Sequence, residues 1–75
     1  MQPKFKVGTL IEDMGKIGVI SKVFKHGALN SEMPLINWRL NYEIYYQDSV
    51  VAIMGEETIL RLIDEGKIII LNIPN

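Results

Sequence analysis

The sequence predicts a mainly β domain, a small five-stranded antiparallel barrel with one short helix before the last strand. Three observations lead to this prediction. Apolar and polar residues alternate along several segments, which is the pattern of half-buried strands. Short turns that contain glycine, asparagine, aspartate or serine separate these segments. One stretch near the C-terminus instead spaces its apolar residues three and four apart, as an amphipathic helix does. At 75 residues, the chain is expected to form a single domain over 1–75.

The first two strands are predicted to form a hairpin. Apolar residues alternate from Phe5 to Ile11, and 13–15 (Asp-Met-Gly) gives a tight turn in which glycine can take a left-handed conformation. The returning strand, Lys16 to Lys25, is rich in β-branched residues. Gly18 inside it predicts a bulge or a close crossing of strands.

The middle of the chain is predicted to contain a loop and the clearest strand. Turn-forming residues cluster between His26 and Pro34, so this stretch is expected to be a loop. Alternation of apolar and polar residues then covers 36–47, which would span about 40 Å if fully extended. Since that exceeds the width of a small barrel, the strand should bend or begin irregularly. A turn at 47–49 leads to a fourth strand at 50–54.

A short helix and a last strand complete the prediction. The helix is expected to open at 55–57, where two glutamates suit the positive end of the helix dipole, and to stop at Gly66. The last strand follows at 67–73. Closure into a barrel is favoured over a flat meander because a meander leaves two sheet edges open. The apolar stripe of the helix consists of Ile59, Leu62 and Ile63.

Composition points to protein contacts. The hydrophobic share is 48%, and with six glycines it rises to about 56%, above the roughly 45–50% of typical soluble domains. A small domain has little interior, so part of this surplus should lie on the surface, where apolar patches mark interfaces. The sequence therefore predicts a homo-oligomer, with a dimer favoured, or docking into a larger protein assembly.

Charge and residue usage argue against several other classes. Eight basic residues stand against nine acidic ones, whereas a phosphate-binding domain is usually basic. No cysteine is present and His26 is the only histidine, so neither a disulfide nor a zinc site is expected. The sequence contains no apolar run long enough to cross a membrane and no signal-like start. We therefore expect a cytoplasmic location, no membrane partner and no cofactor.

Several short stretches resemble the SH3-like small barrels. Residues 7–11 and 15–20 are similar to their opening hairpin, in which a glycine-containing turn leads into Gly-Val-Ile. Residues 41–48 are similar to their third strand, with Ser49 where those barrels usually have glycine. Residues 57–60 resemble the glutamate-x-x-leucine before their final strand. The resemblance covers nearly the whole chain and implies a barrel fold, although the predicted helix is longer than the single 3₁₀ turn of those barrels.

Within this group, the chain is most similar to small barrels of tailed bacteriophages and marine viral sequences, and to KOW-type barrels of ribosomal and transcription proteins. The first similarity implies a phage origin, a structural role and a location in the host cytoplasm or the virion. The second implies RNA or DNA binding. A fold by itself does not fix a function, so both remain expectations.

No residue pattern indicates an enzyme. The carboxylate pairs at 12–13, 56–57 and 64–65 are expected to be solvated surface groups. His26 lies in a predicted loop without a nucleophile motif around it, and no phosphate-binding glycine loop is present. We therefore expect neither a catalytic residue nor a small-molecule substrate.

Two sets of binding residues follow from these considerations. Trp38, Tyr42 and Tyr46 share the apolar face of their strand and are expected in the core, while Tyr45 falls on its polar face. The interface candidates are the residues that should be exposed, or apolar in a turn or loop: Tyr45, Arg39, Met14, Leu29, Met33 and Leu35. The alternative function, a KOW-type nucleic-acid-binding barrel, requires four basic residues to converge on one face: Lys16, Lys22, Lys25 and Arg39.

Overall fold

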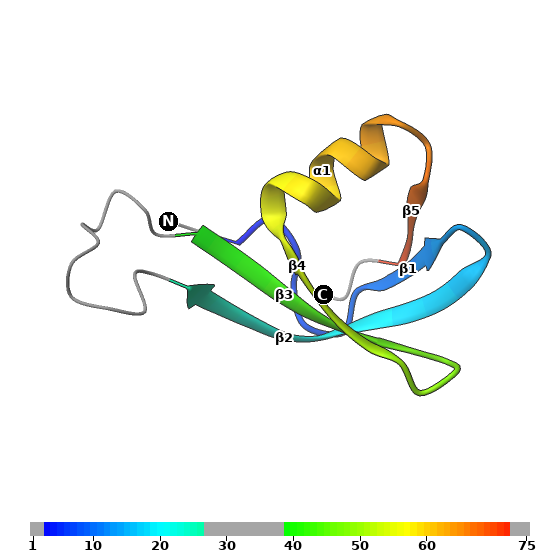
Figure 1. Ribbon diagram of the computed structural model, residues 1–75, viewed down its shortest axis with the longest axis horizontal. Coiled ribbons are helices and arrows are strands. Elements are labelled where there is room, and N and C mark those ends of the chain that lie inside the picture. The colour runs from blue at the N-terminus through cyan, green and yellow to red at the C-terminus, as the bar shows by residue number, and fades with distance from the viewer. Residues whose placement is uncertain (1–2, 27–38, 73–75) are drawn as a thin grey trace.

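The computed structural model describes residues 3–26 and 39–72. The strands are antiparallel and form one sheet in the order β4-β3-β2-β1-β5, with the helix α1 before the last strand (Figure 1). This confirms the predicted mainly β class, the five strands and the position of the helix. In chain order the elements are β1 (Leu10–Asp13), β2 (Lys16–His26), β3 (Arg39–Tyr46), β4 (Val51–Gly55), α1 (Glu56–Asp64) and β5 (Ile68–Asn72).

The predicted closure into a barrel is wrong. Among residues 3–26 and 39–72, β4 pairs only with β3 and β5 pairs only with β1, so these two strands are the edges of the described sheet. The helix accounts for this arrangement. It begins directly after β4, runs over one face of the sheet and ends shortly before β5 (Figure 1). In a barrel, the closed sheet itself encloses its apolar inner face. Here the apolar side chains of the helix cover that face instead.

The first hairpin follows its predicted turn but begins later than predicted. Met14 and Gly15 both have positive φ, 51° and 90°, as a two-residue turn of type I′ requires. The ladder with β2 starts at Leu10 rather than near Phe5. The earlier residues instead form a turn with Gly8 at φ 98°. The Thr9 hydroxyl closes this turn by donating to the Lys6 carbonyl at 2.7 Å.

Gly18 marks a close approach rather than a bulge. A Cβ atom at this position would lie 2.8 Å from Ile44 Cγ2 and 2.9 Å from Tyr46 Cδ1, which is closer than real Cβ contacts. Tyr46, its partner on β3, therefore packs directly against the glycine backbone. The register shift lies a few residues later, between Ile20 and Lys22, and lets the long strand β2 bend.

The helix ends as its sequence predicts. Gly66 has a φ of 77°, and the N–H groups of Gly66 and Lys67 donate to the carbonyls of Ile63 and Leu62. These two bonds form a Schellman motif, which satisfies carbonyls that the helix leaves unpaired. Gly55 precedes the helix without a side-chain cap.

The core lies between α1 and one face of the sheet, called here the inner face. Phe5, Val23, Met54 and Leu62 pack around it as partly buried neighbours. Tyr42 and Tyr46 are buried, as predicted, whereas Trp38 lies outside the described residues. The buried apolar cluster comprises Ile11, Ile20, Tyr42, Ile44, Tyr46, Ile59 and Ile68.

Candidate protein-interaction surface

The face of the sheet opposite the helix, called here the outer face, carries a row of apolar side chains across four strands. Directly paired residues of an antiparallel sheet point to the same face. Tyr45 is paired with Val19 on β2 and with Val51 on β4, and Val19 is paired with Leu10 on β1. We call Leu10, Val19, Tyr45 and Val51 the outer row. It runs from one edge strand nearly to the other, so the outer face offers one continuous apolar path.

Further apolar residues of the edge strands extend this path. Ile53 on β4 is paired with Glu43 and is 63% exposed. At the opposite edge of the same face, Ile69 on β5 is paired with Glu12 and is 50% exposed. Tyr45 at the centre is 49% exposed. Scattered exposed apolar residues are ordinary, but a contiguous set of this kind marks a surface that is suited to contact another protein.

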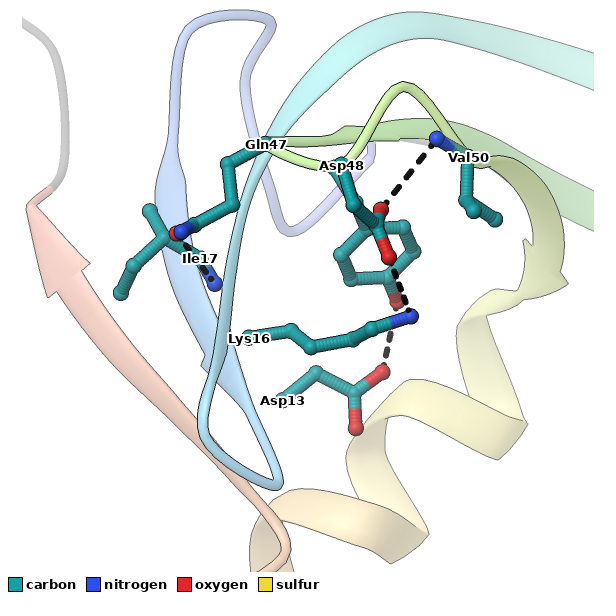
Figure 2. Close-up of polar contacts among 7 residues, drawn as sticks. Asp13, Lys16, Ile17, Gln47, Asp48 and Val50 are labelled. Atoms are coloured by element: carbon teal, nitrogen blue, oxygen red, sulfur yellow. Dashed lines mark hydrogen bonds and ion pairs between the residues drawn. The ribbon is translucent and has the colours of Figure 1, made fainter.

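A shallow groove of about 240 Å³ lies along the outer row. Gln47 lines it, and its side-chain oxygen accepts a hydrogen bond from the Ile17 backbone at 3.2 Å (Figure 2). That bond ties the residue after β3 to β2. The lining is mostly apolar and consists of Leu10, Ile17, Gly18, Val19, Tyr45, Tyr46 and Gln47.

Polar residues lie beside the apolar path. Glu43 accepts a hydrogen bond from the Ser21 hydroxyl at 2.8 Å, and it is paired across the sheet with Lys22. Glu12 is paired with Ile17. The outer face therefore has an apolar centre flanked by a few charged groups of both signs, which is the anatomy of a protein interface.

Beneath the groove, a polar cluster fixes the hairpin between β1 and β2 against the turn after β3. Tyr46 donates from its hydroxyl to Asp13 at 2.6 Å, and burial together with this carboxylate raises the pKa of Tyr46 well above the usual tyrosine range. Lys16 forms an ion pair with Asp48 at 2.9 Å, and its ammonium lies 5.5 Å from the Tyr46 ring centre (Figure 2). The bond with Lys16 lowers the pKa of Asp48. These contacts hold the two turns in place.

A second cluster anchors the N-terminal segment to the start of the helix. Tyr42 donates to Glu56 at 2.5 Å, while its hydroxyl oxygen accepts from the Lys4 N–H at 3.1 Å. Burial and the Glu56 carboxylate raise the pKa of Tyr42 to about 12. A tyrosine with such a pKa stays protonated at neutral pH, so it acts as a hydrogen-bond donor and not as a nucleophile. The ring of Phe5 packs edge-on against Tyr42, with centroids 5.5 Å apart.

The predicted interface residues fall into three groups. Tyr45 lies at the centre of the outer face, and Met14 is 76% exposed at the tip of the first hairpin, away from the groove. Arg39 is the first residue of β3, paired through its backbone with His26. Leu29, Met33 and Leu35 lie outside the described residues.

Sequence reasoning missed the edge-strand residues of the outer face. Val51, Ile53, Ile69 and Leu71 are all roughly half or more exposed. A signal for them was present in the sequence, because β4 and β5 read Val-Ala-Ile-Met-Gly and Ile-Ile-Ile-Leu-Asn without alternation. An unbroken apolar strand has two apolar faces, and one helix of nine residues covers only one face.

The basic residues of the alternative function do not form a compact group along β2. Lys16 is the first residue of this strand and Lys25 its tenth, a separation of about 30 Å along an extended strand. Lys16 is also bound to Asp48, and Lys22 faces Glu43 across the sheet.

Within the ranges 3–26 and 39–72, no set of three histidine, cysteine or carboxylate residues is gathered in a way that could bind a metal ion. The helix in that same part of the chain is too short to cross a membrane.

No family model, curated protein or solved structure matches this chain. The resemblance to SH3-like barrels therefore stays a prediction.

Proposed function

We propose that this chain is a non-catalytic protein-interaction module that associates with itself through the exposed apolar residues of its sheet. The observation that carries this proposal is the apolar path formed by the outer row and by the exposed residues of both edge strands. At about 25 cal/mol per Å² of apolar surface removed from water, covering such a face supplies a favourable free energy of association.

The distribution of polar chemistry supports the same proposal. The buried hydroxyls of Tyr42 and Tyr46 are engaged with carboxylates and keep their protons at neutral pH. The groove is mostly apolar, and two of its polar groups are already engaged: the Gln47 oxygen accepts a hydrogen bond from Ile17, and the Tyr46 hydroxyl donates to Asp13. A small-molecule site needs several convergent polar groups to orient its ligand, and this groove does not present them. It suits the apolar side chains of another protein.

Nucleic-acid binding is the weaker alternative. It would require Lys16 to leave its ion pair with Asp48 and Lys22 to act next to Glu43. Acidic neighbours repel phosphates, and the net charge of the chain is -1. Retention on immobilised RNA or DNA at low salt, lost steeply as salt rises, would favour this alternative.

The proposal is tested by sedimentation velocity from low micromolar to high micromolar concentration. The wild-type chain should shift from monomer to a larger species, and Tyr45→Lys should weaken this shift by about tenfold, because it places a charge at the centre of the apolar face. Met14→Lys is the matched control, since it introduces the same charge at an exposed apolar residue away from the groove.

A wild-type chain that stays strictly monomeric would overturn the proposal. An effect of Met14→Lys equal to that of Tyr45→Lys would move the interface to the hairpin tip instead.

A further inference from the structure

The two edges of the open sheet differ in how freely a new strand could join them. Edge strands of soluble proteins usually carry charges, proline or bulges that prevent pairing with another chain. β4 contains neither a charged residue nor proline, and its pairing with β3 runs without a register shift. The ladder of β5 with β1, in contrast, is broken between Leu10 and Ile11. β4 is therefore the more regular of the two edges.

The register identifies which backbone groups of β4 point away from the sheet. Tyr46 donates its N–H to the Val50 carbonyl at 2.8 Å, so these two residues form a hydrogen-bonded pair. Hydrogen-bonded and non-hydrogen-bonded pairs alternate along an antiparallel ladder. Ala52 and Met54 therefore bond to β3, whereas Val51, Ile53 and Gly55 direct their N–H groups to the open edge. Among the described residues, none provides a backbone partner for these groups.

We propose that β4 pairs with β4 of a second copy of this chain about a two-fold axis at Ile53. This inference rests on the proposed self-association and specifies its geometry. In this register, Ile53 exchanges both of its backbone hydrogen bonds with the copy's Ile53. The Gly55 N–H donates to the copy's Val51 carbonyl, and the reverse bond forms by symmetry. The two sheets then join into one continuous sheet with a shared outer face.

Side-chain chemistry favours a second copy as the occupant of this edge. A two-fold interface brings each patch against itself, so it must be self-complementary. The antiparallel register places Val51 opposite Gly55 and Ile53 opposite Ile53, so each exposed side chain of β4 gains a neighbour on the copy. β4 itself carries no charged residue, and the next residues along the chain, Glu56 and Glu57, lie in α1 and outside the strand pair. No like charges are opposed along the pair.

The test combines association constants with amide hydrogen exchange measured by NMR. Ile53→Lys places two positive charges, one from each copy, opposite each other at the two-fold axis. It should raise the dimer dissociation constant by about tenfold or more. Met14→Lys is the matched control, since it introduces the same charge at an exposed apolar residue at the tip of the first hairpin, away from β4. It should change the constant by no more than about threefold. In the wild type, the Val51, Ile53 and Gly55 amides should exchange more slowly as protein concentration rises.

The possible failures are distinguishable. Association without added protection of these three amides, or with equal effects of the two lysine variants, would overturn β4 pairing but leave self-association standing. Species larger than a dimer, with concentration-dependent protection at Ile68 and Ile70 as well, would replace the two-fold pair with head-to-tail pairing of β4 and β5. A chain that remains monomeric at all concentrations would overturn both proposals.

Discussion

The two faces of the sheet are built from neighbouring residues but differ in how completely they are covered. On β3, Tyr42, Ile44 and Tyr46 point inward and are buried, whereas Tyr45 points outward and is half exposed. The inner face is covered by α1, and every buried side-chain polar atom in the described part of the chain has a hydrogen-bond partner. The outer face is apolar as well, but no described element covers it.

This difference separates residues that stabilise the fold from residues that are available for contact. Inner-face residues contribute to folding because they leave water when α1 packs on the sheet. Outer-face residues such as Ile53 and Ile69 stay in contact with water in the isolated chain, so their burial energy is released only on association. An isoleucine on the inner face should therefore matter for the stability of the fold, whereas an isoleucine on the outer face should matter for association.

The largest expected effect compares one isoleucine on each face. Ile44→Ala should lower the free energy of unfolding by about 2–5 kcal/mol, because it opens a cavity at a residue that is 0% exposed. Ile53→Ala removes a side chain that is 63% exposed and should change the free energy of unfolding by less than about 1 kcal/mol. Urea unfolding followed by circular dichroism at low micromolar concentration measures both, before association contributes.

If Ile44→Ala does not fold, Ile44→Val replaces it, with an expected loss of about 0.5–1.5 kcal/mol. Equal losses at the two isoleucines would mean that the outer face is covered within the single chain.

The next effect is the dependence of stability on alkaline pH, and its sign follows from the raised pKa of Tyr42. An unfolded tyrosine ionises near pH 10, whereas Tyr42 in the folded chain has a pKa of about 12. Between these values the unfolded chain releases a proton that the folded chain keeps, so stability falls as pH rises from about 10 to about 12. Tyr42→Phe should cost about 1–2 kcal/mol at pH 7, because it removes the bond to Glu56, and should show a shallower alkaline decline.

Urea unfolding at pH 8, 10 and 11 measures this slope. Tyr45→Phe is the control on the outer face, since this hydroxyl has no described partner, and it should leave stability at pH 8 nearly unchanged. Parallel alkaline declines for the wild type and Tyr42→Phe would show that Tyr42 does not contribute to the pH dependence.

Much of the fold could be predicted because local chemistry fixes it. The positive φ of Gly15 and Gly66, the stripe through Ile59 and the inward direction of Tyr42 all follow from residue type and spacing. Barrel closure could not be predicted in this way. It depends on whether two strands that are distant in sequence meet, and here α1 covers the inner face while β4 and β5 remain unpaired with each other.

The candidate surface was predictable only in part for a related reason. Tyr45 stood out because it interrupts the polar side of an alternating strand. Val51 and Ile53 lie in a strand that is apolar on both sides, so the sequence alone could not tell which of its residues face the helix. That assignment required the register with β3, in which Val51 is opposite Tyr45 and Ile53 is opposite Glu43.

The smallest expected effect lies in the turn that sets this register. Ser49 has a φ of 69°, a left-handed conformation that costs a residue with a Cβ about 1 kcal/mol more than it costs glycine. Ser49→Gly should therefore stabilise the chain by up to about 1 kcal/mol, reduced by the greater freedom of glycine in the unfolded state. Ser21→Gly is the control, because Ser21 lies in β2 and its hydroxyl donates to Glu43, so this change should destabilise.

A slip of one residue at this turn would exchange the two faces of β4 and send Val51 and Ile53 inward. Ser49→Gly should leave their outward direction unchanged, because the Ser49 N–H bond to the Tyr46 carbonyl at 2.9 Å and the ladder beyond it involve only backbone groups. Urea unfolding gives the stability change, and backbone contacts between β3 and β4 in NMR spectra report the register. A destabilised variant with an unchanged register would mean that the left-handed turn is not a source of strain.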